Sequence, residues 1–220
     1  MKNVIIAGAT GMTGGLVLDY CLASPEIKSV TVIVRKPTGI TNYKLNEVVH
    51  PDFSDLSAVT ESFKNQDIAY YCLGVYTGAV DRETFRKITL NYTQVFADTL
   101  RKISPETTFY FLSGMGADPT EKSKVMFARD KGAAENYLNT LNFNQLFIFR
   151  PAYIYPVIPR KEPNLTYRIF RFFYPVMKLM YPSGVIPSTN LAKAMFHAGL
   201  KGTEKHILEN IDIRQLAAKI

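Results

Sequence analysis

A chain of 220 residues can bury the core of one domain and is short for two. Hydrophobic residues make up 47% and charged residues 20% of the chain, a composition that excludes a wholly disordered protein. The net charge of +7 suits an anionic partner, which could be a nucleic acid, an acidic membrane surface or the phosphates of a small molecule. Charge alone does not choose among these.

Several classes of protein lack support in the sequence. There is no apolar run of about 18 residues, so we predict no transmembrane segment, and we see no export signal. A lysine-rich tail, zinc-finger spacing and an RNA-recognition strand motif are all missing, so we expect no nucleic-acid partner. Cys21 and Cys72 fall in a predicted core helix and a predicted core strand, which suggests reduced, buried thiols and a cytoplasmic protein.

Short apolar runs alternate with helical patterns as far as Arg150. The runs predict strands at residues 4–7, 30–34, 48–49, 68–73, 109–112 and 146–149. Helix starts are expected at Ser54, as a cap with an acid in the first turn, and at Asp81. Strands and helices that alternate in this way predict a doubly wound parallel sheet.

The amino-acid composition changes after Arg150. Residues 151–160 are rich in proline and aromatic residues, which predicts a long loop. Residues 167–181 carry an aromatic and methionine stripe at helical spacing, with Pro175 as an interruption. We expect this helix to pack over the sheet, with a membrane-surface or partner helix as the alternative. Ser188 is a predicted N-cap, a short strand is expected near His206, and a last helix near Asp212.

A glycine-rich turn follows the first predicted strand directly. Gly8 permits a tight turn, Gly11 allows a pyrophosphate to approach the backbone, and Gly14 lets helix and strand pack closely. Phosphates would then sit at a helix N-terminus, where free N–H groups point at them. The remaining contacts predicted in the turn come from Thr10, Met12 and Thr13. The pattern predicts a dinucleotide site.

The end of the second predicted strand bears on the choice of cofactor. An acid there would bind the ribose 2′-hydroxyl of NAD, whereas arginine accommodates the 2′-phosphate of NADP. Arg35 and Lys36 stand at this place, so we expect NADP(H) to be preferred over NAD(H). The alternative is that both are solvated loop charges. Asp52, after the third strand, is a candidate for contact with the adenine edge or an ordinary helix-start residue.

These features together resemble the atypical, extended-like branch of the short-chain dehydrogenase/reductase superfamily. Within it the chain is most similar to the Tat-interacting oxidoreductase-like group, on motifs spread over nearly its whole length. The motifs lie at residues 32–36, 72–75, 112–118, 149–152 and 191–195. The resemblance implies an α/β, Rossmann-type doubly wound parallel sheet with a small C-terminal substrate lobe. We expect one NAD(P)-binding domain over 1–220, with a cofactor half of about 1–150 and a lobe of about 151–220.

The resemblance also implies a set of residues around the nicotinamide end of the cofactor. These are Leu73, Gly74, Ser113, Lys131 and Pro151. In the superfamily, a serine or threonine after the fifth strand works with a Tyr-x-x-x-Lys pair, whose phenol transfers a proton to or from the substrate oxygen. The lysine contacts the ribose, although a helical lysine can also be an ordinary surface charge.

The catalytic half of the pattern is incomplete in this chain. Lys131 is present, but Phe127 stands four residues earlier, where tyrosine is expected, and a phenyl ring cannot transfer a proton. Ser113 lies at the strand end, yet Gly114 and Met115 occupy the places where the serine nearest the substrate is expected. Asn91 matches the superfamily's helical asparagine or is simply a polar helix residue.

Three explanations compete. Another phenol could replace the missing one, and the candidates are Tyr76, Tyr153 and Tyr155. The acceptor could need no protein acid, as with a quinone or flavin. The third explanation is that the protein binds NADPH without turnover.

The sequence therefore predicts an NADP(H)-dependent oxidoreductase of unknown small substrate. The alternatives are a non-catalytic NADPH-binding regulatory or redox-sensing protein and a sugar-nucleotide epimerase or dehydratase. No metal is predicted, because the three histidines, His50, His197 and His206, show no ligand spacing. A homodimer is a possibility by analogy with the fold.

Overall fold

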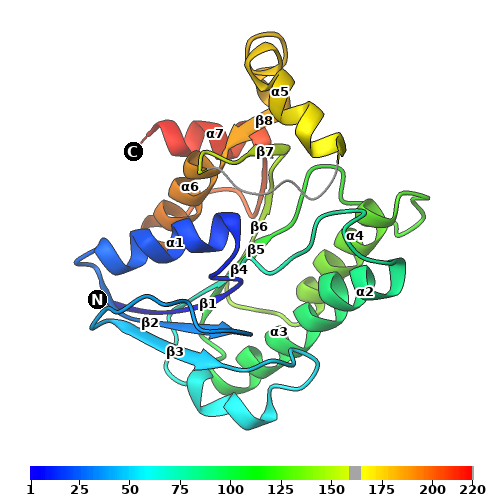
Figure 1. Ribbon diagram of the computed structural model, residues 1–220. Helices are drawn as coiled ribbons and strands as arrows, with labels where there is room; N and C mark the ends of the chain where they lie inside the picture. Colours follow the sequence, from blue (N-terminus) through cyan, green and yellow to red (C-terminus); the bar gives the residue numbers. More distant parts are fainter. Residues whose placement is uncertain (159–164, 220) are drawn as a thin grey trace.

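A parallel β-sheet forms the centre of the computed structural model, which describes residues 1–158 and 165–219. Its order is β3-β2-β1-β4-β5-β6-β9 (Figure 1). The strands are β1 (Lys2–Ala7), β2 (Ile27–Val34), β3 (Leu45–Val49), β4 (Ile68–Tyr71), β5 (Thr108–Leu112), β6 (Leu146–Arg150) and β9 (Ile207–Glu209). The predicted α/β doubly wound sheet is confirmed.

Helices cover both faces of this sheet. One face carries α1 (Met12–Ala23), α6 (Ser188–Lys201) and α7 (Asn210–Ala218). The other carries α3 (Tyr92–Ile103), α4 (Met126–Thr140) and the 3₁₀ segment Ser57–Phe63. The short helix α2 (Arg82–Arg86) runs through a π-helical turn at Lys87–Asn91 into α3.

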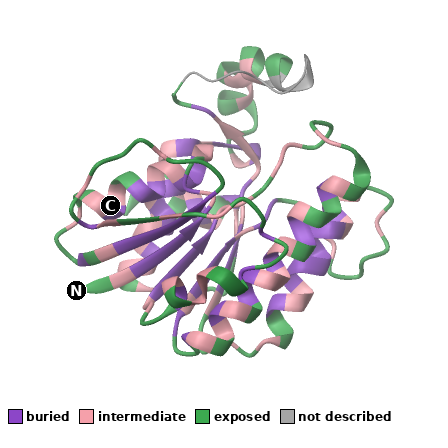
Figure 2. Ribbon diagram, turned by 60° about the horizontal axis from the view of Figure 1, so that its bottom comes forward, coloured by how far each residue is buried: buried purple, intermediate pink, exposed green. Residues whose placement is uncertain are grey.

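The core lies in two layers because strand side chains alternate between faces. In β1, Val4 and Ile6 join the cluster under α1 and α6, whereas Ile5 and Ala7 join the cluster under α3 and α4. Figure 2 shows the central strands buried between the helical layers. Burial on both faces explains why these strands are continuous apolar runs rather than alternating ones.

The strand order reverses beside β1, which pairs with β2 on one side and with β4 on the other. The connections after these strands leave in opposite directions, so a crevice opens at the carboxyl edge of the sheet. The glycine turn at residues 8–14 lies at this edge. The fold therefore positions the predicted cofactor site at the switch point.

Two predicted helix starts differ in detail from the structure, and one is confirmed. Ser54 caps no helix, because its hydroxyl and main-chain N–H both donate to Asp52, and the 3₁₀ segment begins only at Ser57. Ser188 is the first residue of α6 and not its cap, and its Oγ accepts from the N–H of Val157 at 3.2 Å. Asp81 does cap α2, by accepting from the N–H of Thr84.

The segment after Arg150 holds more structure than the predicted loop. Tyr153–Tyr155 forms β7, which pairs in parallel with β8 (Val185–Pro187) as a separate two-stranded sheet. Residues 156–158 continue without helix or strand, and residues 159–160 of the predicted loop lie outside the described residues. A strand with prolines close by is possible here because β7 has only one neighbour.

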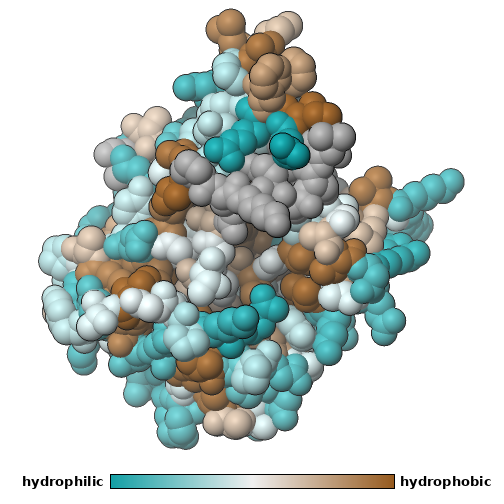
Figure 3. Space-filling view, in the orientation of Figure 1, coloured by the Kyte–Doolittle hydropathy of each residue, from teal (hydrophilic) through white to brown (hydrophobic). Residues whose placement is uncertain are grey.

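Helix α5 (Leu165–Met180) also departs from the prediction. It continues through Pro175, and it does not pack over the sheet but projects from the body next to β7 and β8 (Figure 1). Apolar side chains stand at the surface of this projection in Figure 3. Among the described residues no helix has the length and hydropathy needed to cross a membrane.

Candidate functional site

The glycine turn is so tight that side chains are excluded from it. Gly8 has φ +86°, and a Cβ there would lie 2.6 Å from the carbonyl carbon of Cys72. A Cβ on Gly14 would lie 2.2 Å from the carbonyl oxygen of Gly8, and one on Gly11 would lie 3.0 Å from the same atom. The turn therefore needs glycine at its first and third positions to bring α1 against β1 and β4.

The N-terminus of α1 is left open. Its N-cap residue, Gly11, makes no side-chain hydrogen bond to the helix, and the first intrahelical bond runs from the N–H of Gly15 to the oxygen of Gly11 at 3.0 Å. The main-chain N–H groups of the first turn, at Met12, Thr13 and Gly14, thus have no partner in the helix. Such a cradle suits an anionic group, which the helix dipole also favours.

A cleft of about 200 Å³ opens beside this helix end, at the carboxyl edge of the sheet. It brings together the start of α1, the segments after β4 and β5, helix α4 and strand β7. The lining residues are Gly11, Met12, Thr13, Cys72, Leu73, Gly74, Val75, Tyr76, Leu112, Ser113, Phe127, Lys131 and Ile154. Eight of the residues predicted for the site are thus neighbours in one cleft.

Lys131 reaches this cleft from the first half of α4. Only 7% of the residue is exposed, and its Nζ donates to the carbonyl oxygen of Leu112 at 2.8 Å. Burial lowers the pKa of the Lys131 ammonium to about 8, although the nearby Glu135 and Cys72 act in the opposite direction. Lys131 is therefore a buried amine that still carries its charge at neutral pH, rather than a solvated surface lysine.

An ion-pair network fixes the sheet edge behind Lys131. The carboxylate of Glu135 accepts from Nε of Arg150 at 3.0 Å and also from Nη2 of the same guanidinium and the hydroxyl of Ser113. Arg150 continues to Glu209 at 3.0 Å. Because the Ser113 hydroxyl donates to Glu135, its proton is already committed and is not presented to a substrate.

The two positions that lack the expected hydroxyls touch each other. A Cβ on Gly114 would lie 2.3 Å from Cζ of Phe127, which is the ring atom that bears the hydroxyl in tyrosine. The ring thus occupies the space that a side chain at position 114 would need. The losses at 114 and 127 are therefore coupled: the cleft holds a hydrocarbon contact where a proton-transfer pair was expected.

The other candidate phenols lie in different places. Tyr76 lines the cleft. In β7, Ile154 lines the cleft, so the alternation of side chains along the strand directs Tyr153 and Tyr155 to the opposite side. The ring of Tyr155 stacks on Tyr174 of α5, with ring centroids 3.7 Å apart. Of the three phenols, the structure brings only Tyr76 to the cleft.

Asn91 and Cys72 also differ from expectation. Asn91 is exposed and lines a separate surface groove with Glu83 and Arg86, so it does not meet Lys131. Cys72 was predicted to be a buried thiol in a core strand, but it is only half-buried, because it lies just beyond β4 where the cleft begins. Burial nonetheless raises the pKa of its thiol to about 12, so it stays protonated at neutral pH.

The residues predicted for the far end of the cofactor lie around the ends of β2 and β3. Arg35 and Lys36 are exposed directly after β2, a position compatible with either alternative. The carboxylate of Asp52 accepts from the N–H of Ser54 at 2.8 Å, and these hydrogen bonds hold its pKa below the usual value. Asp52 thus forms a local turn that starts no helix, and its contact with the adenine edge stays a prediction.

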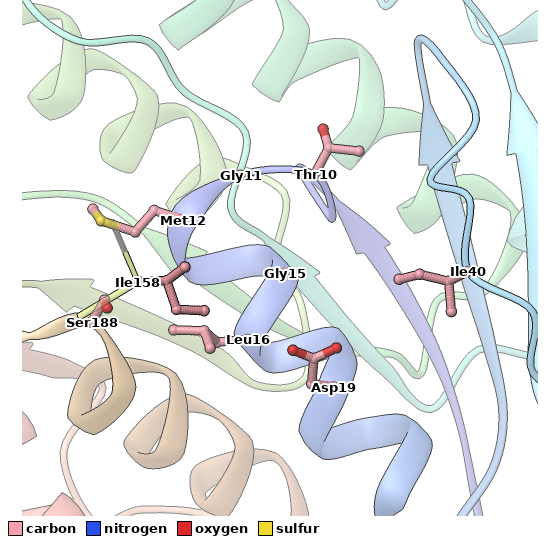
Figure 4. Close-up of a pocket in the computed structure, with 9 residues that line it drawn as sticks. All are labelled: Thr10, Gly11, Met12, Gly15, Leu16, Asp19, Ile40, Ile158 and Ser188. Atoms are coloured by element: carbon pink, nitrogen blue, oxygen red, sulfur yellow. The ribbon is translucent and has the colours of Figure 1, made fainter. Parts of the chain in front are cut away.

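A second hollow, of about 320 Å³, runs along α1 from the glycine turn to Asp19 (Figure 4). Gly11 and Met12 border both hollows. Thr10 lines this one and not the Lys131 cleft, together with Ile40 from the loop after β2. Pro151 lines neither, but its carbonyl oxygen accepts from the N–H of Met115 at 2.8 Å, beside the end of β5.

Sequence reasoning missed the network behind the cleft. Glu135 follows Lys131 by four residues and so lies on the same face of α4, which was an available signal. Arg150 ends β6, but its pairing with Glu135 depends on a contact between distant segments that no local pattern reveals. Across residues 1–158 and 165–219, the side chains form no group of three or more suited to hold a metal ion.

Comparisons with known proteins agree with this geometry. A family model described as NAD(P)H-binding matches residues 8–169. Protein HTATIP2 of Rattus norvegicus is 27% identical over 89% of this chain and 80% of its own length. The mitochondrial protein fmp52 of Aspergillus clavatus is 29% identical over 93% of this chain and 89% of its own.

A solved structure supports the fold. SP1627 of Streptococcus pneumoniae, described as a putative NADH-flavin reductase, superposes with a TM-score of 0.64 at 15% identity, covering 93% of this chain and 95% of that one. The likeness to HTATIP2 confirms the predicted resemblance to the Tat-interacting oxidoreductase-like group. The NAD(P)H-binding family model matches residues 8–169, which is well over half of the chain, so the chain belongs to this family.

Proposed function

We propose that this protein binds NADPH at the carboxyl edge of its sheet and reduces a conjugated, apolar acceptor such as a quinone or a flavin. The observation that carries the proposal is the contact between Gly114 and Phe127. Neither residue carries the hydroxyl expected at its position in a proton-transfer pair, whereas the glycine turn and Lys131 are both present at the cleft.

The chemistry of such an acceptor fits the groups that are present. A reduced nicotinamide, when bound, supplies a hydride. A quinone or flavin takes up that hydride and holds the negative charge on its own heteroatoms, which then gain a proton from water. A simple ketone or aldehyde would instead concentrate the charge on one oxygen and need an acid beside it. The chain has no acidic hydroxyl at 114 or 127 to meet that need.

The wall of the cleft supports an apolar acceptor. Met12, Leu73, Val75, Phe127 and Ile154 contribute side chains without hydrogen-bonding hydrogens, and they converge from four different elements. The cationic Lys131 lies at the base of this wall, where it would hold the cofactor ribose and attract its phosphates. The description of the similar Streptococcus pneumoniae chain as a putative NADH-flavin reductase agrees with this class of acceptor.

A preference for NADPH rests on Arg35 and Lys36. Both follow β2, and the next acidic residue along the chain, Glu47, accepts hydrogen bonds from Thr38. A guanidinium here would pair with a 2′-phosphate in a charge-assisted contact. Titration with NADPH and with NADH, followed by calorimetry, tests this. Arg35→Asp should weaken NADPH more than NADH, and unchanged binding of both would show that Arg35 faces solvent.

The acceptor is tested by following oxidation of NADPH with a quinone, free flavin, a ketone and an aldehyde. We expect turnover with the first two only. Phe127→Tyr restores a phenol four residues before Lys131 and should favour the carbonyl compounds. Tight NADPH binding without turnover on any acceptor would instead establish the second candidate, a non-catalytic NADPH-binding regulator, which the same loss of hydroxyls favours.

We also propose that the protein acts in the cytoplasm, since both of its cysteines, Cys21 and Cys72, are free thiols. The similar fmp52 protein is labelled mitochondrial, so this chain either shares that location or differs from fmp52 in acting in the cytoplasm. Fractionation of cells that express the tagged chain decides between these outcomes.

A further inference from the structure

Helix α5 presents a face of large apolar side chains to solvent. Six residues form this face, and each is at least 48% exposed: Ile169, Phe172, Phe173, Val176, Leu179 and Met180. Their spacing of three, four, seven, ten and eleven residues from Ile169 places them in one stripe of the helix. Leu179 is 84% exposed and Phe172 is 78% exposed, values that are unusual for side chains of this kind.

The body of the protein binds the helix by a different side. Tyr174 stacks on Tyr155 of β7 at a centroid distance of 3.7 Å. Since successive residues turn by about 100°, Tyr174 lies roughly 200° around the helix from Phe172. The apolar face is therefore directed away from the contact with β7. Figure 1 shows that α5 projects from the body, and Figure 3 shows apolar side chains at the surface of this projection.

The charge of the helix indicates which kind of surface would bind this apolar face. Leu165–Met180 contains three basic residues, Arg168, Arg171 and Lys178, and no acidic one. At about 100° per residue, Arg168 lies at the border of the apolar stripe, about 20° from Leu179, whereas Arg171 and Lys178 lie about 80° and 100° beyond that border; Arg168 and Lys178 are exposed. A second copy packed through the same face would bring two helices of three positive charges together with no acidic side chain on either. A membrane with anionic headgroups and an apolar interior would bury the apolar face of the helix and attract its basic side chains.

We propose that α5 is a membrane-surface helix that buries its apolar face in the interfacial layer of a bilayer containing anionic lipids. Phe172, Phe173 and Leu179 enter the boundary between headgroups and acyl chains, and Arg168, at the border of the stripe, meets lipid phosphates. The inference does not depend on the proposed reaction, because vesicle binding is measured without cofactor or acceptor. In this proposal, the projecting helix α5 holds the protein at a lipid surface.

The experiment is co-sedimentation of the full chain with vesicles of phosphatidylcholine alone and of phosphatidylcholine with phosphatidylglycerol. We expect binding to the anionic vesicles. Phe172→Ser with Leu179→Ser should weaken that binding by at least about tenfold, as expected for the loss of two large apolar side chains from the buried face. Arg168→Gln should weaken it by about fivefold, and Lys178→Gln, farther from the buried face, should weaken it less.

A matched control removes exposed apolar groups from other parts of the surface. Tyr43 is 92% exposed and Val125 is 61% exposed, and the variant Tyr43→Ser with Val125→Ser should bind as the native chain does. Circular dichroism shows whether each variant is folded. The proposal is overturned if the native chain binds neither vesicle, if it binds both equally, or if the control loses binding to the same extent as the α5 variant.

Oligomeric state gives an independent outcome. Sedimentation velocity of the native chain and of the Phe172→Ser, Leu179→Ser variant should give the same mass. A native dimer that the substitutions convert to a monomer would show that a second copy covers the apolar face, and would overturn the lipid proposal.

Discussion

A methyl group added at Gly114 tests the contact on which the proposed function depends. Its Cβ would lie 2.3 Å from Cζ and 3.1 Å from Cε1 of Phe127. Carbon atoms in contact are normally about 3.5–4.0 Å apart, so the ring must move by about 1 Å or more. Gly114→Ala therefore forces a rearrangement of the wall of the cleft.

The size of the effect follows from the environment of the ring. Adding a methyl group to a packed site costs about 1–3 kcal/mol. Phe127 is only half-buried, so its ring can turn partly toward solvent, and we expect a cost near the lower end, about 1 kcal/mol. In a domain of this length that corresponds to a fall in Tm of about 2–4 °C. In the double variant with Phe127→Leu, the shorter side chain has no Cζ, and most of this cost should disappear.

The assay is a double-mutant cycle in urea, with all four proteins measured under the same conditions. Gly74→Ala serves as the control, because nothing lies within 4 Å of a Cβ at that position. We expect a coupling free energy of about 1 kcal/mol between positions 114 and 127. Effects that add to within about 0.3–0.5 kcal/mol would refute the contact, and with it the explanation of the missing hydroxyls.

Three further predictions concern the rest of the site. Gly14→Ala should abolish NADPH binding in calorimetry, because its Cβ would lie 2.2 Å from a backbone oxygen of the turn; Gly15→Ala, at 3.2 Å from its nearest backbone oxygen, should retain most of the affinity, and equal losses would contradict this. Glu135→Gln should lower the unfolding free energy by about 3 kcal/mol, because it leaves the charge of Arg150 poorly paired; a urea titration that shows a loss under about 1 kcal/mol would argue against the network. The pKa of Lys131 is about 8 in the folded chain against an ordinary 10.5, so between these values the unfolded chain holds more protons and stability should rise with pH, by up to about 3 kcal/mol. Lys131→Met should remove this rise, and an unaltered pH profile would show that another group causes it.

What the sequence predicts well here is what depends on neighbouring residues. The strands, the glycine turn after Ala7 and the cap at Asp81 are local patterns with local physical causes, and each is found in the structure. The cap expected at Ser54 fails because a nearby carboxylate, that of Asp52, accepts both of its hydrogen bonds. A competing partner two residues away is enough to displace a helix start.

The features that escaped prediction depend on contacts between distant segments. The stripe of α5 is plain in the sequence, but periodicity shows only that a face is apolar and not what covers it. The pairing of Arg150 with Glu135 and the contact of Gly114 with Phe127 join segments separated by loops. A missing tyrosine can be read from the sequence, whereas the ring that fills the vacant space can be seen only in three dimensions.

Because of the network centred on Glu135, one side of the cleft tolerates amino-acid substitution less than the other. Through Ser113, Arg150 and Glu209 it ties α4 to the ends of β5, β6 and β9, and a substitution at Glu135 or Arg150 leaves a buried charge without its main partner. The opposite wall, built on β7, is bound by no comparable set of ions among the described residues. Relatives that keep the cofactor should therefore diverge in acceptor through β7 and the segment beyond it, while the floor of the cleft is inherited almost unchanged.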